Sequence, residues 1–177
     1  MAAYKKLYEQ FYRAIFGNIK FARMRGVTIG KNCRLFTTFI GTEPFLIRIG
    51  NNVTIAPGVK LITHDGSLSL MKDERGRRYS YQPIEIGNDV FIGVNSVILP
   101  GVKIEDQVIV AAGSVVTKSV RARSVIGGVP ARVLTNFDAM EKRVLEDCPS
   151  HSELTKDISY EAQVKKITRY TFKPYID

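Results

Sequence analysis

Aliphatic residues recur every six positions along the middle of the chain. One series runs through Ile86, Ile92, Ile98, Ile104, Val110 and Val116. A second series of small or β-branched residues stands four positions later in each unit, at Val90, Ser96, Val102, Val108, Ser114 and Val120. An amphipathic helix places its apolar residues three and four apart, and a strand places them two apart. A period of six is instead typical of a hexapeptide solenoid, in which short strands wind into a parallel β-helix.

The same period predicts earlier units and two interruptions. The earlier units open at Ile29, Leu35, Ile49, Ile55 and Leu61. The step to Ile49 is two residues longer than a multiple of six, so we expect a small interruption at 41–44, where Gly and Pro permit it. The step from Leu61 to Ile86 is one residue longer than such a multiple, and the residues between are polar and lack the period. We therefore expect a loop excursion at 65–83, of the length that is usually functional in a compact domain.

Helices are predicted on both sides of the solenoid. Residues 3–24 carry a wide apolar and aromatic stripe, with Lys and Arg mostly elsewhere, and Gly17 weakens the helix near its end. This helix either packs on the solenoid or a neighbouring subunit, or forms a basic amphipathic surface for peripheral membrane contact. The expected organisation is an N-terminal amphipathic helix, a β-helix domain and a C-terminal helical segment with a tail of partial order, at 1–26, 27–134 and 135–177.

Composition narrows the classes of function. The 177 residues, 45% of them hydrophobic, suit one globular domain. No apolar run reaches the roughly 18 residues that span a bilayer, and the charged N-terminus does not resemble a secretory signal. Cys33 and Cys148 have no metal-like spacing, so we expect reduced thiols in a cytoplasmic protein. A net charge of +9 suits a phosphorylated cofactor or an anionic surface, and the absence of a recognisable motif argues against nucleic acid as a partner.

Four segments resemble parts of the hexapeptide-repeat acyltransferases. Residues 62–66 (ITHDG) are similar to the catalytic-histidine segment of that family, and residues 86–93 (IGNDVFIG) to the segment after its loop, which more often has Trp where Phe91 stands. Residues 111–118 (AAGSVVTK), followed by 128–132 (GVPAR), are similar to the end that binds coenzyme A. The resemblance implies a single-stranded left-handed parallel β-helix, acetyl-CoA as co-substrate, no metal, and a homotrimer with sites between subunits.

Within this family, the chain looks nearest to the maltose, galactoside and surface-polysaccharide O-acetyltransferases. The segment 41–50 (GTEPFLIRIG), together with the aromatic N-terminal helix, is most similar to the polysaccharide branch. The leading hypothesis is therefore an acetyl-CoA-dependent O-acetyltransferase acting on a carbohydrate hydroxyl in surface polysaccharide biosynthesis. The alternatives are transfer to serine, to an antibiotic or to the amine of an amino sugar, and a non-catalytic solenoid scaffold.

His64 is the candidate catalytic residue. A sugar hydroxyl is a poor nucleophile, so a base must remove its proton during attack on the thioester. Histidine suits this role because its charge changes near neutral pH, and His64 stands where the solenoid period breaks. Orienting its ring requires a carboxylate or carbonyl on the other nitrogen, for which Asp65, Glu43 and Glu85 are candidates.

The remaining candidate residues bind substrates. Gly93, Ala111 and Ala112 are small enough to lie along a pantetheine arm, and three hexads per turn would stack Gly93 on Ala111. The resemblance assigns further coenzyme contacts, including two cations that suit phosphate, to Thr117, Lys118 and Arg132. On the acceptor side, the excursion is expected to form a wall of the pocket. The residues assigned to substrate binding are Asp65, Glu43 and Phe91.

Overall fold

The three-sided coil expected from the hexads is present in the structure, a computed structural model that describes residues 2–154, 158–169, 171–173 and 175. Its strands are two to five residues long, apart from a six-residue closing strand, and they stack into three sheets. Sheet A contains β1 (Thr28–Ile29), β3 (Ile47–Ile49), β8 (Ile84–Ile86) and β11 (Lys103–Ile104). Sheet B contains β2 (Arg34–Leu35), β4 (Thr54–Ile55), β9 (Phe91–Ile92), β12 (Ile109–Val110), β14 (Ser124–Gly128) and β15 (Ala131–Asn136). Sheet C contains β5 (Lys60–Leu61), β10 (Val97–Ile98) and β13 (Val115–Val116).

The strand register confirms three hexads per turn. Phe91 pairs in parallel with Ile109, and Val97 with Val115, each 18 residues further along the chain. Every aliphatic residue that opens a predicted hexad is buried, as are all six residues of the second series. The core is therefore a column of Ile, Leu and Val side chains stacked from one coil to the next. The turns between strands repeatedly use left-handed backbone, which Gly, Asn and Asp adopt at little cost. The non-glycine residues at such turns are Asn32, Asn52, Asp89, Asn95, Gln107 and Arg123.

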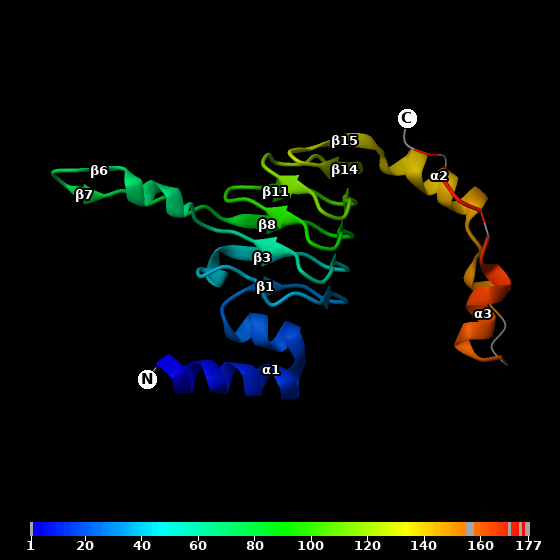
Figure 1. Cartoon of the computed structure of the whole chain (residues 1–177), viewed down its shortest axis with the longest axis horizontal. Helices are drawn as coiled ribbons and strands as arrows, with labels where there is room; N and C mark the ends of the chain where they lie inside the picture. Colours follow the sequence, from blue (N-terminus) through cyan, green and yellow to red (C-terminus); the bar gives the residue numbers. More distant parts are fainter. Residues whose placement is uncertain (1, 155–157, 170, 174, 176–177) are drawn as a thin grey trace. The chain divides into compact units, whose positions relative to one another are not determined.

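Both interruptions lie where the period predicts them. The first interruption contains a short helix, η1 (Pro44–Leu46). Because of this interruption, paired residues of the first two coils, such as Thr28 and Arg48, lie 20 residues apart in the sequence. The second leaves the solenoid after β5 and returns at β8. Although its residues lack the hexad period, this excursion contains η2 (Gly66–Leu70) and a small hairpin of β6 (Lys72–Asp73) and β7 (Gly76–Arg77). Figure 1 shows this hairpin extending away from the stacked coils.

Both ends of the coil are covered by other elements. The predicted N-terminal helix is confirmed as α1 (Ala2–Met24), although Gly17 has a non-helical backbone that divides it into two helical segments. The second segment lies against the first coil and buries Phe21 and Ala22 (Figure 1). At the other end, β15 pairs antiparallel with β14 and covers the edge of sheet B.

The chain forms two compact units, residues 1–138 and 139–177. The C-terminal region contains α2 (Phe137–Asp147), η3 (His151–Glu153) and α3 (Tyr160–Ile167). The helix α3 is more regular than the partial order expected of this region: Ser159 accepts a hydrogen bond from the backbone of Ala162, and Lys165 pairs with Glu161. Residues 155–157, 170, 174 and 176–177 of that region lie outside the described residues. No helix among the described residues has the length and apolar character needed to cross a bilayer.

Candidate active site

His64 stands at the corner where the chain passes from sheet C to the excursion. The corresponding turn in the next coil is made by Gly101, but at His64 the chain leaves the solenoid. The backbone of His64 forms an antiparallel bridge with Tyr81, and the Gln82 N–H donates to the Thr63 carbonyl at 2.8 Å. The two ends of the excursion therefore hold each other, and His64 is fixed at its base with 37% of its side chain exposed.

Glu43 is the carboxylate that the structure brings to His64. Its Oε2 lies 3.0 Å from Nδ1 of His64. The hydroxyl of Thr63 donates to the same oxygen at 2.7 Å, and the hydroxyl of Thr42 donates to Oε1 at 2.6 Å. Thr42 and Thr63 were not among the predicted site residues; the only sequence signal for them is a hydroxyl beside each of two predicted site residues, Glu43 and His64.

The approach of Glu43 depends on the first interruption. Gly41 has φ +65°, and a Cβ added there would lie 2.9 Å from the Thr63 hydroxyl and 3.1 Å from the Leu61 carbonyl. A side chain at this position would be strained and would push the interruption away from the His64 segment. Glycine at 41 therefore allows Thr42 and Glu43 to pack beside Thr63 and His64.

The environment keeps Glu43 ionised. Partial burial raises the pKa of Glu43, but hydrogen bonds from Thr42, Thr63 and His64, with the charge of a protonated His64, lower this pKa below its ordinary value. An ionised carboxylate accepts the hydrogen on Nδ1, which leaves Nε2 of His64 as the acceptor nitrogen. The pair thus has the arrangement of a histidine base oriented by a carboxylate.

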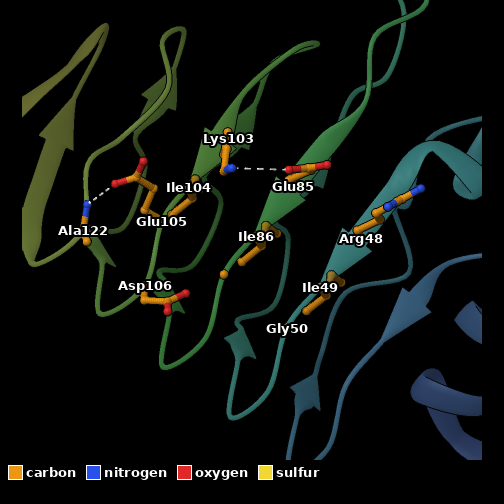
Figure 2. A pocket seen from close by; sticks show the side chains of 11 residues that line it. Arg48, Ile49, Gly50, Glu85, Ile86, Lys103, Ile104, Glu105, Asp106 and Ala122 are labelled. Atoms are coloured by element: carbon orange, nitrogen blue, oxygen red, sulfur yellow. Dashed lines mark hydrogen bonds and ion pairs between the residues drawn. The ribbon is translucent and has the colours of Figure 1, made fainter.

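The other two carboxylates proposed as orienting partners are engaged elsewhere. Asp65 accepts a hydrogen bond from the backbone of Ser67 at 2.9 Å and caps η2. The hydrogen bonds from Ser67 also lower the pKa of Asp65. Glu85 lies on β8 and pairs with Lys103 at 3.8 Å in a groove of about 630 Å³ on the face of sheet A. Figure 2 shows this groove, whose charged lining comes from Arg48, Glu85, Lys103, Glu105 and Asp106.

Several candidate residues line two pockets, and Thr117 belongs to both of them. His64 and Asp65 line a pocket of about 610 Å³ together with Thr117. Thr117 also lines a second pocket, of about 330 Å³, whose other residues include Lys118 and Arg132. The expected coenzyme residues at this end of the solenoid thus form a surface that continues towards His64. Within the described residues, no group of three or more His, Cys, Asp or Glu could hold a metal ion.

The remaining candidates lie away from His64 in a single chain. The N–H of Gly93 donates to the Val110 carbonyl at 2.8 Å, and a Cβ on Gly93 would lie 2.5 Å from the backbone of Ala112. The expected stacking is therefore confirmed, but at the corner between sheets B and C. Phe91 is 45% exposed on β9 of sheet B, the side of the coil opposite the corner of His64. A role for Phe91 beside His64 requires a second copy of the chain.

Comparison with known proteins identifies the family. A family model described as hexapeptide repeat of succinyl-transferase matches residues 83–118. The chain is 41% identical to Protein CapG of Staphylococcus aureus over 88% of its own length and 90% of that protein. The chain belongs to the hexapeptide-repeat acetyltransferase family. It is accordingly an acetyltransferase of the hexapeptide class.

Two further relatives carry more specific names. Galactoside O-acetyltransferase of Escherichia coli K12 is 36% identical over 70% of this chain, and the match spans 61% of that protein. A solved structure of a galactoside acetyltransferase in complex with coenzyme A superposes with a TM-score of 0.51 at 27% identity, covering 72% of this chain and 74% of that one.

Proposed function

We propose that this protein transfers the acetyl group of acetyl-CoA to a hydroxyl of a carbohydrate, with His64 as general base. The observation that carries the proposal is the 3.0 Å contact between Nδ1 of His64 and the ionised Glu43, which leaves Nε2 as the acceptor nitrogen of a histidine that lines a pocket. The names of the two galactoside acetyltransferases and the coenzyme A complex of one support the acceptor and the donor. The similarity of segment 41–50 to polysaccharide O-acetyltransferases supports a role in surface polysaccharide biosynthesis.

The chemistry follows from the arrangement of the pair. Nε2 of His64 accepts the proton of the hydroxyl as the oxygen attacks the thioester carbonyl. The carbon–oxygen bond forms, the carbon–sulfur bond breaks, and the proton passes from His64 to the departing thiolate of coenzyme A. Glu43 stabilises the positive charge that His64 carries between these steps, and the hydroxyls of Thr42 and Thr63 hold Glu43 in place.

Coenzyme A is assigned to the surface that runs from Thr117 to the end of the solenoid. Lys118 and Arg132 lie in the pocket there and provide cations for its phosphates. Another corner of the coil holds Gly93, Ala111 and Ala112. One coenzyme molecule can therefore contact these small residues and also Lys118 and Arg132 only where two subunits meet. Phe91 is likewise separated from His64 within one chain. Both separations support the predicted homotrimer with sites between chains.

Acetyl transfer is tested by measuring thiol release from acetyl-CoA across a panel of sugars, nucleotide sugars, serine and chloramphenicol. We expect turnover with a sugar, which His64→Ala lowers by about 100-fold or more. Glu43→Gln, which keeps the shape but removes the charge, should lower kcat by about 10- to 100-fold without weakening coenzyme binding.

The matched control is His151→Ala, which removes the other histidine from the C-terminal unit and should leave turnover unchanged. Turnover confined to serine or chloramphenicol would keep the base and replace the acceptor. Full activity in His64→Ala would refute His64 as the base. No binding of acetyl-CoA at all would refute the proposed reaction.

A further inference from the structure

Three side chains form a stacked track that leads away from His64 along the excursion. The ring of Tyr81 lies 6.0 Å from the ring of His64, measured between centroids. The rings of Tyr79 and Tyr81 lie 6.1 Å apart with an angle of 8° between their planes. The guanidinium carbon of Arg77 lies 4.7 Å from the centroid of Tyr79. Because these residues alternate along an extended chain, they lie on one side of it.

The track is fixed relative to the catalytic histidine. Its inner end is held by the bridge between Tyr81 and His64 and by the hydrogen bond from Gln82 to Thr63. Its outer end is β7 of the hairpin, where Arg77 pairs with Lys72. The hydrogen-bonded backbone therefore fixes the track beside the ring of His64.

The surfaces of the track are open to a ligand. Tyr79 is 62% exposed and Tyr81 is 52% exposed. The exposed parts of these stacked rings offer apolar surface with a polar hydroxyl rim, which suits the apolar faces and hydroxyl edges of sugar rings. The contact between the rings of Tyr81 and His64 places the inner end of this surface beside the catalytic histidine.

Arg77 differs from the two neighbouring arginines in its partners. Asp73 forms ion pairs with both Arg75 and Arg78, so these two charges are compensated within the hairpin. No carboxylate among the described residues pairs with Arg77, which contacts the face of Tyr79 instead. A guanidinium that is exposed and stacked on a ring remains available for a carboxylate or a phosphate.

We propose that Tyr81, Tyr79 and Arg77 form an acceptor track that selects an acidic saccharide longer than one sugar ring. The inference rests on the proposed function and names its substrate class. The tyrosines contact sugar rings that follow the reacting one, and Arg77 binds an anionic group carried beyond them. The anion is a carboxylate of an acidic sugar or a phosphate of a diphosphate-linked sugar, and the two sources are separated experimentally.

The test measures kcat and KM with matched acceptors. The probes are an oligosaccharide of alternating hexose and hexuronic acid, the same oligosaccharide with its carboxyl groups reduced to alcohols, a neutral disaccharide with a diphosphate at its reducing end, and a neutral monosaccharide. The variants are Arg77→Gln, Arg77→Lys and Tyr79→Ala. The matched control is Arg75→Gln, which removes a charge from the same hairpin but off the track.

We expect Arg77→Gln to raise KM for an anionic acceptor by about tenfold, with kcat within about twofold of wild type. Arg77→Lys should recover part of this loss, because it restores the charge without the planar fork. Tyr79→Ala should raise KM about fivefold for charged and reduced oligosaccharides alike, and leave the monosaccharide unchanged. An effect limited to the hexuronic acid oligosaccharide identifies a carboxylate as the anion, and one limited to the diphosphate-linked disaccharide identifies a phosphate.

An equal rise in KM in Arg77→Gln and Arg75→Gln would overturn the role of Arg77. So would a rise in KM in Arg77→Gln that is equal for the charged and the reduced oligosaccharides. A change in oligomeric mass by light scattering, with KM unchanged, would instead assign the track to subunit contact and also overturn the proposal. Calorimetric binding of the acidic oligosaccharide without acetyl-CoA separates this proposal from the proposed reaction. If no acceptor is acetylated but this binding still depends on Arg77, the reaction fails and the track stands.

Discussion

The carboxylate of Glu43 receives hydrogen bonds from three side chains, and each of them favours its ionised form. Because the pKa of Glu43 in the folded protein is lowered from its ordinary value of 4.5, ionised Glu43 stabilises the folded state relative to the unfolded chain. This contribution is fully present above the ordinary value and is lost as the pH falls through the lowered one. The same bonds that orient His64 thus connect the site to the stability of the protein.

We predict that the stability difference between wild type and Glu43→Gln depends on pH. The variant should unfold at a lower temperature at pH 7, by about 2–4 °C for each kcal/mol lost, and the gap should close as the pH falls below the ordinary value of 4.5. Thermal unfolding from pH 7 to pH 3 measures this. Hydrogen bonds from Ser67 also lower the pKa of Asp65. Asp65 is present in both proteins, so its contribution cancels in the difference. A gap that stays constant across this range would contradict the prediction.

At the scale of elements, the excursion is a separable insertion in the coil. Strands on its two sides pair 37 residues apart, as Thr54 does with Phe91, whereas coils without an insertion pair 18 apart. The difference equals the length of segment 65–83. Removing that segment makes Ile84 follow residue 64 directly, and Ile84 then takes the buried position that Val102 holds in the next coil.

We predict that deleting 65–83 together with His64→Gly leaves a folded solenoid. Glycine is needed because residue 64 would then make the left-handed turn that Gly101 makes in the next coil. Circular dichroism and thermal unfolding should resemble wild type within several degrees, and acetyl transfer should be lost. The control deletes 65–84 instead, one residue more, which places Glu85 in the buried position of Ile84 and should aggregate or unfold. Equal behaviour of the two deletions would refute the insertion model.

The hexads made the coil predictable because burial imposes their period on every turn. The positions of both interruptions followed from the same arithmetic. The hairpin within the excursion could not be predicted in this way, because its residues are polar and exposed and carry no period. The partner of His64 could not be chosen among three carboxylates, because the contact with Glu43 depends on how the first interruption returns across the coil at Gly41.

At the scale of the whole molecule, the coil needs both of its ends covered, because the last coil at each end would otherwise expose apolar side chains and unpaired strand edges. At the first coil, the amide of Asn18 donates to the Leu35 carbonyl at 2.9 Å. The guanidinium of Arg23 donates to the Ile29 carbonyl at 2.8 Å. These contacts all come from the second segment of α1, beyond Gly17.

The first segment of α1 makes fewer contacts of this kind. Tyr12 packs against the core, and Glu9 pairs with Arg25 at 3.2 Å. The large apolar side chains on its other face are exposed, at 79% for Tyr4, 66% for Leu7 and 65% for Phe11. The segment therefore contributes less to the fold of a single chain than its aromatic content suggests.

We predict that the two segments of α1 differ in importance for folding. Deleting 1–16 should lower the unfolding temperature only slightly, because it leaves Asn18, Phe21 and Arg23 on the first coil. Deleting 1–25 should uncover that coil and lower the temperature by about 10 °C or more, or cause aggregation, since two buried side chains and the carbonyl caps are lost together. Scanning calorimetry and light scattering on both variants measure this. If deleting 1–16 proved as damaging as deleting 1–25, the exposed aromatic face would itself be required for stability, and the division at Gly17 would have no consequence for the cap.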